Sequence, residues 1–469
     1  MSDMTGNSVV PAADTTNKYI VTGKQLRLNM TSAGVGTALE YFDFALYGLA
    51  AALVFNPLFF PTMEPAVGLL VGFATFGIGF VARPVGGIII GYLGDRLGRK
   101  WALLFTVGLM GIATTAIGLL PTYGQIGVWA PVLLVFLRIL QGFGAGAEIA
   151  GGSLLLSEVA PTGRRGIVAS VITLGTNAGS MTAAGVWLIV TSTLSKDDLL
   201  AWGWRIPFLC SILVMLWTLW MRRSIKESPA YKKNEGKLQR TSMAALYADL
   251  FRNGWRNVLV VIGLRIGEVG TSTFYQVFFV GYIATKVSDK AIATQALLIA
   301  TAIAFVTIPF FGWLSDKIGR KRVFGTLAAF QFLWSVPALL LVETQSFTGI
   351  LLAMLGGVTV GVVGMASVEG SFLPEIFGAR YRYAGLAVSR EIGGMVSGGL
   401  VPFIGAAILT MTSSWVPLAI YVSALALISF IATLVCPEPC GRDLTTETDL
   451  PIGSSRRLIE APAASVSQA

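Results

Sequence analysis

Residues 91–100 read GYLGDRLGRK, and residues 312–321 read GWLSDKIGRK. Both copies place Gly, Asp, Gly, Arg and Lys at the same positions, and both follow a long apolar segment. The first glycine of each copy permits close helix contact. The aspartate can pair with the arginine four positions later or with the N-terminus of a neighbouring helix. A repeat of this kind predicts two homologous halves with equivalent loops.

The composition predicts an all-α polytopic membrane protein. The 469 residues are 54% hydrophobic and 13% charged, with a mean hydropathy of +0.72, whereas soluble proteins average about 25% charged residues. The chain has no histidine, which excludes His-based catalysis and His metal sites. Its three cysteines form no even framework, so we interpret them as packing residues. We therefore predict no metal and no cofactor.

Twelve apolar segments are long enough to span a bilayer, which takes about 20 residues. They fall near 30–56, 66–93, 101–120, 128–157, 166–193, 203–222, 257–285, 291–315, 322–342, 347–374, 383–410 and 415–436. These positions predict two six-helix halves at 28–222 and 257–436, joined by a linker at 223–256. Residues 1–27 form the predicted N-terminal tail. Residues 437–469 lack apolar periodicity and are predicted to form a mobile C-terminal tail.

The loop charges predict how the chain sits in the membrane. One set of alternate loops holds about 20 Lys and Arg residues and the other about three, so the first set is expected to be cytoplasmic. Both termini then lie in the cytoplasm, and the chain spans the plasma (inner) membrane. The net charge of +9 is accounted for by this orientation signal, which argues against a nucleic-acid partner.

The repeated loop resembles the signature of the major facilitator superfamily. This resemblance implies a gating motif that holds one conformation and releases it during transport, with two six-helix halves around a central cavity. The residues that match this motif are Gly91, Asp95, Arg96, Gly98 and Arg99 in the first half, and Gly312, Asp316, Gly319 and Arg320 in the second.

Further stretches are similar to the metabolite:H⁺ symporter branch of that superfamily. They include LEYFDFALYG (39–48), LRILQGFGAGAE (137–148) and LRIGEVGTSTFYQVFF (264–279), of which the last looks most like shikimate-permease-type members. Arg390 and Glu391 depart from that pattern, because those relatives tend to carry neutral residues there. The fifth apolar segment lacks the Gly-Pro motif of the superfamily's antiporters, which favours symport.

Charged residues inside the apolar segments converge near the predicted midplane. With a helical rise of 1.5 Å per residue, they lie roughly 14–20 Å from the cytoplasmic helix ends. The carboxylates are Glu40, Asp43, Glu148, Glu268 and Glu391, and the guanidiniums are Arg83, Arg265 and Arg390, with Arg138 nearer the outer side. Since buried charges are expensive in a membrane, each is expected to face a partner or a wet cavity.

Four of these residues are candidates for proton coupling: Asp43, Glu40, Glu148 and Arg138. Asp43 is either the proton carrier or half of a structural ion pair with Arg83. Glu148 shares a helix face with Arg138 and either couples proton movement or braces two helices.

The candidates for substrate binding are Arg265, Arg83, Tyr41, Gln141, Tyr275, Gln276, Arg390 and Glu391. Arg265 is the preferred ligand for a substrate carboxylate, because guanidinium offers a bidentate fork. The alternative is that Glu268, one turn away, neutralises it. Arg390 and Glu391 point about 100° apart on a helix, so they cannot brace each other well. The aromatic residues could instead be ordinary packing.

These features predict a secondary active transporter. An enzyme would need a nucleophile with a base, or a metal cluster, and the sequence shows neither. The expected reaction is proton-coupled uptake of a small organic anion, such as a shikimate-like or aromatic carboxylate, by alternating access. The alternative substrates are a zwitterionic osmolyte (proline or betaine) or a sugar. A channel is disfavoured because no filter sequence is visible. A transporter-like receptor remains an alternative interpretation. We expect a monomer.

Overall fold

The computed structural model describes residues 23–97, 99–146, 148–223, 242–287, 291–378, 381–444, 446 and 448–450. Within these ranges the chain is helical almost throughout and forms no strand. The all-α prediction is confirmed.

The first half comprises six long helices or helix pairs. They are α1 (Gly23–Leu53), α3 (Pro65–Leu97), α4 (Arg99–Leu119), the pair α6 (Trp129–Ala145) and α7 (Glu148–Val159), α8 (Arg165–Thr193) and α10 (Arg205–Arg223). Short elements connect them: α2 (Phe55–Phe59), α5 (Tyr123–Ile126), η1 (Thr162–Arg164), α9 (Lys196–Asp198) and η2 (Leu199–Gly203).

The second half repeats this count, but three of its helices contain a π-helical segment. These composite helices are α13 (Trp255–Thr273) with η3 (Phe274–Phe278) and α14 (Phe279–Lys286), α17 (Phe347–Met354) with η4 (Leu355–Val362) and α18 (Val363–Ile376), and α19 (Arg382–Gly394) with η5 (Met395–Gly399) and α20 (Val401–Thr412). The others are α15 (Ala291–Ile318), α16 (Arg320–Glu343) and α21 (Val416–Val435). A further helix, α12 (Met243–Asn253), lies in the predicted linker.

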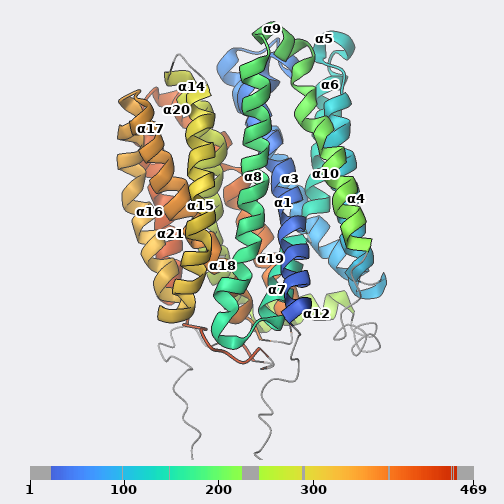
Figure 1. The fold of residues 1–469 in the computed structure, drawn as a ribbon, viewed down its shortest axis with the longest axis vertical. Coiled ribbons are helices and arrows are strands. Elements are labelled where there is room, and N and C mark those ends of the chain that lie inside the picture. Colours follow the sequence, from blue (N-terminus) through green and yellow to red (C-terminus); the bar gives the residue numbers. More distant parts are fainter. Residues whose placement is uncertain are drawn as a thin grey trace, which may run out of the picture.

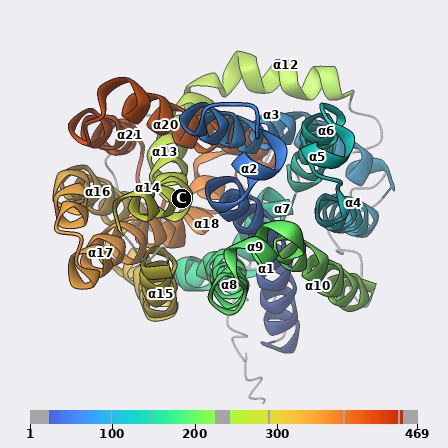
Figure 2. The same ribbon diagram turned by 90° about the horizontal axis from the view of Figure 1, so that it is seen from above.

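The two halves lie side by side with their long helices roughly parallel (Figures 1 and 2). In the view from above, α1, α4, α8 and α10 gather on one side and α15, α16, α17 and α21 on the other. At the interface α8 packs against α15, and α3 packs against α19, η5 and α20. We call the end of the molecule where α3 and α15 finish the basic end, and the other the opposite end.

Nine helices of the described chain are long and apolar enough to cross a membrane, and the bent pair Lys196–Gly203 with Arg205–Trp220 makes a tenth if it is one span. The two remaining predicted spans are α1 and α4. The former carries Glu40 and Asp43 within its apolar run, and the latter qualifies only as the shorter apolar helix Leu104–Leu119.

Large apolar side chains cover outer faces of the bundle. Leu213, Trp217 and Trp220 on α10 are more than half exposed, as are Val306 on α15 and Leu333 on α16. Such a surface would be unfavourable in water and suits contact with lipid tails. The chain is therefore a multi-pass membrane protein.

Glycines bring α3 close to both halves. A β-carbon at Gly77 would lie 2.5 Å from the carbonyl oxygen of Gly399, across the interface between the halves. Gly142 of α6 lies similarly against the backbone of Gly79. Larger residues would push these helices apart, so the glycines set the close approach that membrane helices favour.

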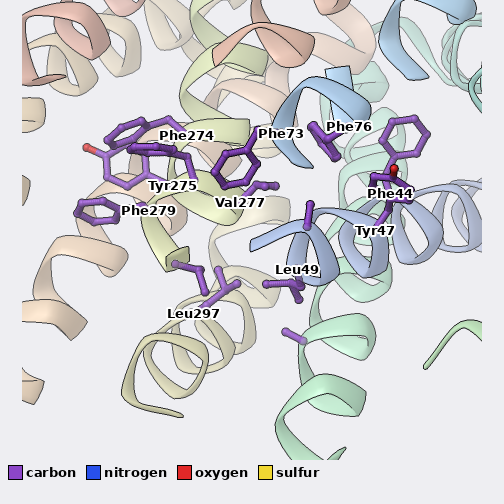
Figure 3. Packing of buried hydrophobic residues seen from close by; sticks show 14 of the residues in the cluster. Phe44, Tyr47, Leu49, Phe73, Phe76, Phe274, Tyr275, Val277, Phe279 and Leu297 are labelled. Atoms are coloured by element: carbon purple, nitrogen blue, oxygen red, sulfur yellow. The ribbon is translucent and has the colours of Figure 1, made fainter. Parts of the chain in front are cut away.

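An apolar cluster continues from one half to the other near the opposite end. Figure 3 shows Phe44, Tyr47 and Leu49 of α1 with residues of α3, η3 and α14. The rings of Phe73 on α3 and Phe278 on η3 have centroids 5.9 Å apart. The halves are therefore in apolar contact on this side of the interface.

The described part of the C-terminal segment differs from the predicted mobile tail. The Glu438 carboxylate accepts bonds from the backbone N–H groups of Arg320 at 3.0 Å and Lys321 at 3.2 Å, at the start of α16. The Arg442 guanidinium donates to the carbonyls of Glu375 at 2.7 Å and Ile376 at 2.9 Å, at the end of α18. Helix termini leave unpaired backbone groups that polar residues can satisfy. Apolar periodicity does not reveal this kind of packing.

Candidate functional site

Two adjoining cavities lie between the halves, with about 530 and 770 Å³ of empty space. Both are lined by Tyr41 and Ser180 of the first half and by Arg265, Glu268, Ser272 and Gln276 of the second. They therefore form one central space, as the sequence predicts.

The two cavities differ in their walls. The smaller one, the polar chamber, is additionally lined by hydroxyl, amide and charged side chains, among them Ser153, Thr173, Thr176, Asn177, Glu369 and Arg390. The larger one, the aromatic chamber, is lined by Phe44, Phe76, Phe80, Arg83, Glu391 and several aliphatic residues. A ligand in this space meets hydrogen-bonding groups on one side and ring faces on the other.

Four charged side chains of the second half form one network at the polar chamber. Nη1 of Arg265 donates to Oε2 of Glu268 at 2.5 Å and to the two carboxylate oxygens of Glu369 at 2.7 and 2.6 Å. Nη1 of Arg390 donates to Oε1 of Glu369 at 2.6 Å. All four side chains are buried. The network joins α13, α18 and α19. Arg265 is therefore paired with both Glu268 and Glu369, and not with Glu268 alone.

A second network joins the halves. Arg83 of α3 donates through Nη2 to Glu40 of α1 and through Nε to Oε2 of Glu391 of α19 at 2.9 Å. The alternative pairing of Arg83 with Asp43 is therefore not the one that the structure forms. Arg390 and Glu391 point to different partners, as their adjacent positions predict.

Asp43 is surrounded by neutral polar groups. The Ser211 hydroxyl of α10 donates to Oδ1 of Asp43, and the Thr114 hydroxyl of α4 faces the same carboxyl group. Oδ2 of Asp43 has no hydrogen-bond partner within the described chain, and the described residues form no salt bridge to it. Asp43 is fully buried. This is an environment in which a carboxyl group can hold a proton without breaking an ion pair.

Arg138 belongs to the same group of side chains but is held by neutral acceptors. It donates to the side-chain oxygen of Gln141 and, at 3.3–3.4 Å, to the carbonyl of Phe76. Gln141 in turn donates to the Thr114 hydroxyl at 2.7 Å. The chain Arg138–Gln141–Thr114 thus connects the guanidinium to the surroundings of Asp43 without a direct ion pair.

Guanidiniums also cover several ring faces. The Arg138 carbon Cζ lies 4.4 Å from the ring centroid of Phe44 and 4.2 Å from that of Tyr47. The Arg83 Cζ lies 4.6 Å from the Phe44 centroid and 5.4 Å from that of Phe80. These cation–π contacts stabilise buried positive charge at the rim of the aromatic chamber.

Two guanidinium N–H groups at the polar chamber stand without acceptors. Among the buried side chains that the structure describes, Nε of Arg265 and Nε of Arg390 have no hydrogen-bond partner, and both residues line the polar chamber. A buried charged donor without an acceptor costs at least about 1–3 kcal/mol. An anion placed there would remove that cost.

The other candidates fall in different places. Tyr41 and Gln276 line both chambers, and Gln276 donates to the Ser272 hydroxyl at 2.9 Å. Tyr275 instead packs between Phe274 and Phe279 and lines neither chamber. Gln141 also lines neither chamber. Glu148, at the start of α7, accepts a bond of 3.4 Å from Thr106.

The second copy of the repeated motif closes the basic end. Oδ1 and Oδ2 of Asp316 accept bonds from the backbone N–H groups of Gly166 at 2.8 Å and Ile167 at 3.0 Å, at the N-terminus of α8 in the other half. Asp316 also pairs with Arg320 at 2.7 Å. It therefore makes both of the contacts that the sequence allows.

The two glycines of this copy occupy sites that suit glycine. A β-carbon at Gly312 would lie 2.9 Å from the carbonyl oxygen of Gly166, and Gly319 has φ of 108°, which other residues rarely adopt. The corresponding residues of the first copy cannot be compared. Gly98 lies outside the described residues, and only the backbone is described at Gly91, Asp95, Arg96 and Arg99.

Acidic and basic residues that recur seven positions apart in each half interact between the halves. Arg165 of α8 lies 3.5 Å from Glu375 of α18, which also contacts Arg320 at 3.3 Å. Arg382 of α19 interacts electrostatically with Glu158 of α7. The backbone carbonyl of Arg442 accepts a bond of 2.6 Å from Arg165, so the C-terminal segment joins this closure.

Sequence reasoning missed Glu369, the centre of the second-half network. It lies in the apolar run 347–374 in the stretch SVEGSF (367–372). A charge within an apolar run is the same signal that identified Glu40, so Glu369 could have been found. Ser211 and Thr114, the partners of Asp43, carried no comparable signal, because hydroxyls are common in membrane helices.

The geometry, an all-helical membrane bundle of two halves around a charged cavity, is that of a secondary transporter. The model of the Sugar (and other) transporter family matches residues 30–256 and 233–448, and the chain belongs to this family. It is thus a transporter rather than an enzyme.

Relatives and solved structures agree with this assignment. The chain is 43% identical over 410 residues to YdfJ of Escherichia coli (strain K12), covering 87% of this chain and 96% of that protein. It is 37% identical over 411 residues to the shikimate transporter of the same organism, covering 86% and 92%. Identity to that organism's proline/betaine transporter is 31% over 439 residues, covering 92% and 87%.

The fold is similar to that of the proton:xylose symporter XylE bound to 6-bromo-6-deoxy-D-glucose. The TM-score is 0.74 at 18% identity, covering 91% of this chain and 99% of that one. This likeness confirms the major-facilitator-type fold of two halves.

Proposed function

We propose that this transporter takes up a small organic anion together with protons. The observation that carries the proposal is the pair of buried, unpartnered N–H groups on Arg265 and Arg390, two residues that line the polar chamber. A carboxylate is the natural acceptor for two guanidinium donors, and such charge-assisted hydrogen bonds are about twice as strong as neutral ones. Arg265 and Arg390 are thus the proposed anchors of the substrate.

The rest of the cavity supports a hydroxylated carboxylate with an apolar ring or body. Thr173, Asn177, Ser180 and Ser272 offer hydroxyl and amide partners, while Phe76 and nearby aliphatic residues offer an apolar surface. The identity of 37% to the shikimate transporter is in line with such a ligand.

Asp43 is the proposed proton carrier of the first half. Its hydroxyl partners remain available whether the carboxyl group is charged or neutral, and its charge is not fixed by a salt bridge among the described residues. Arg138, Glu40 and Glu148 are proposed to adjust to its protonation through the neighbouring helices.

The motif residues of the basic end are proposed to act as the gate. The contacts of Asp316 with α8 and of Arg165 with Glu375 hold the halves together there, and Phe73 with Phe278 holds them nearer the opposite end. Alternating access then requires that one set of contacts breaks while the other persists. We propose the equivalent role for Gly91, Asp95, Arg96, Gly98 and Arg99.

The orientation is also a proposal. The basic end is assigned to the cytoplasm of a plasma membrane by the positive-inside rule, which puts both termini in the cytoplasm. We propose the halves 28–222 and 257–436, the linker 223–256 and a monomeric unit.

Proton movement on substrate addition tests this function. The protein is reconstituted in weakly buffered liposomes, and external pH is followed while shikimate, an aromatic acid and small dicarboxylates are added in turn. Alkalinisation with one carboxylate, abolished by a protonophore, is the expected result. Saturable uptake of a carboxylate without any proton movement would overturn proton coupling.

The second candidate substrate is a zwitterionic osmolyte, which the 31% identity to a proline/betaine transporter favours. A quaternary ammonium group is usually recognised by open aromatic faces. Here the faces of Phe44 and Phe80 are already covered by Arg83, whose charge would repel such a group. Betaine and proline belong in the same assay, and their accumulation in place of any carboxylate would favour this candidate.

A further inference from the structure

We propose that Glu268 and Glu369 form a second proton-binding site, which takes up one proton when a substrate carboxylate binds to Arg265 and Arg390. The identity of the substrate rests on the proposed function. The proton site itself rests on the geometry of the two glutamates.

The two carboxyl groups converge on one atom. Nη1 of Arg265 lies 2.5 Å from Oε2 of Glu268 and 2.6–2.7 Å from the oxygens of Glu369, so both carboxyl groups lie against the same guanidinium nitrogen. Two ionised carboxylates this close to each other repel, and a proton bound to either one removes that repulsion.

The charge balance links this proton to the substrate. Arg265 and Arg390 balance the two ionised glutamates, so the empty cluster is neutral without a proton. A substrate carboxylate adds one negative charge to this buried site. An uncompensated buried charge is strongly destabilising, and a proton on the glutamate pair removes it. Anion and proton therefore bind together.

The residues around Glu268 and Glu369 indicate that these two glutamates are the groups that accept the proton. Among the described residues, the charged and titratable groups that face this pair are Arg265 on α13, Arg390 on α19 and Tyr41 on α1. Arg83 and Glu391 line the aromatic chamber together with Glu268, and they pair with each other at 2.9 Å. The side of α8 that lines the chamber contributes uncharged groups, such as Thr173 and Asn177. The guanidiniums remain charged and a tyrosine releases its proton only at high pH, so the glutamates are the groups that exchange a proton.

This site is separate from Asp43. The second-half network runs through α13, α18 and α19, whereas Asp43 contacts Ser211 of α10 in the first half. Each half therefore carries one proton site, and the transporter is expected to couple two protons to one anion.

The pH dependence of ligand binding tests this number. The affinity of the purified full-length protein for shikimate, the probe, is measured by calorimetry at several pH values. The slope of log Kd against pH gives the number of protons taken up. We expect a slope of about two, with an affinity loss of about a hundredfold per pH unit above the pH at which both sites lose their protons.

Variants assign the two protons. Glu268→Gln and Asp43→Asn should each reduce the slope to about one, and the double variant to about zero. Glu268→Asp, which keeps a titratable group, should restore the wild-type slope. The control Glu343→Gln changes a part-exposed glutamate at the opposite end and should have no effect. A wild-type slope in a folded Glu268→Gln variant would overturn the second site.

Infrared spectroscopy tests the proton site without any ligand. On acidification, the substrate-free protein should gain a carboxylic acid carbonyl band. This band should be weaker in Glu268→Gln, where Asp43 still contributes, and unchanged in Glu343→Gln. If shikimate does not bind, the proposed substrate is wrong for this probe. The infrared band needs no ligand, so it still shows whether Glu268 binds a proton. An equal band in Glu268→Gln and wild type would overturn the proton site.

Discussion

The two halves of the cavity use the same charged residue types in opposite ways. In the first half, Gln141 and Thr114 stand between the Arg138 guanidinium and the surroundings of Asp43. In the second half, Arg265 and Arg390 contact Glu369 directly at 2.6–2.7 Å. Around Asp43 the first half separates its charges with neutral side chains, although Arg83 and Glu40 of the same half pair directly. The second half packs its charges into a closed network.

This difference assigns different tasks to the halves. Asp43 can gain or lose a proton without breaking an ion pair within the described chain, so it can respond to pH before substrate arrives. The second-half network is balanced without a ligand, so an incoming anion favours the uptake of a proton there. The first half therefore suits proton sensing, and the second suits coupled binding of anion and proton.

The largest expected effect comes from Arg265→Gln. It removes a donor of the proposed anion site and leaves Glu268 and Glu369 with one guanidinium fewer. Truncating one partner of a buried charge pair costs about 2–5 kcal/mol, so carboxylate uptake into proteoliposomes should fall by at least about thirtyfold. The control Arg322→Gln alters an exposed arginine of α16 and should leave uptake unchanged. Full activity of Arg265→Gln would show that Arg265 does not hold the anion.

Asp43→Asn should uncouple transport from the proton gradient. Asparagine keeps an acceptor for the Ser211 hydroxyl, so the fold should persist, but the proton site is gone. Accumulation driven by one pH unit should fall about tenfold for each coupled proton lost, while exchange of labelled for unlabelled substrate continues. Net uptake measures the gradient-driven accumulation, and counterflow on the same vesicles measures the exchange. Loss of exchange as well as net uptake would instead indicate that Asp43 takes part in substrate binding. The control is Asp197→Asn, which changes an exposed residue of α9.

Asp316→Asn should weaken the closure of the basic end. It replaces a charged acceptor of the Gly166 and Ile167 N–H groups with a neutral one. A loss of about 1 kcal/mol would shift the balance of conformations about fivefold. Spin labels at the exposed positions Thr162 and Lys317 report the separation of α8 and α15 by electron paramagnetic resonance. An unchanged distance distribution would show that Arg165 and Glu375 suffice to hold this end.

The smallest expected effect concerns the C-terminal segment. Burial raises the pKa of the Cys440 thiol above its usual range, so its alkylation should be slow at a pH at which an exposed thiol reacts. Glu438→Gln weakens the bonds to the start of α16. A loss of about 0.5–1 kcal/mol should speed alkylation by about two- to fivefold. The rate is measured by mass spectrometry in a Cys210→Ala background. No change would show that Arg442 alone anchors the segment.

Much of the fold could be predicted because spanning segments are local properties of the sequence. Apolar length marks each membrane helix regardless of its neighbours, and the duplicated decapeptides at 91–100 and 312–321 mark the two halves. The depth of Asp43, Arg83 or Arg265 follows from the helical rise alone. The sequence therefore predicts a similar depth for these charges.

The C-terminal segment could not be predicted in the same way. Its docking depends on Glu438 and Arg442 meeting backbone groups at the ends of α16 and α18. Those groups are unpaired only because the helices end there, and they lie nearby only because the halves are assembled. A polar sequence with these properties looks like any solvated tail.

The sequence by itself determined the membrane class, the two-half organisation and the buried charges of the cavity other than Glu369, because apolar length, repetition and charge are readable residue by residue. Only the tertiary structure decided the partners: Arg83 with Glu40 and Glu391, Arg265 with Glu268 and Glu369, and Asp43 with Ser211. Depth fixes the level at which a side chain lies, but pairing depends on how each helix is rotated about its axis and on which helices are neighbours. Packing between distant segments sets both.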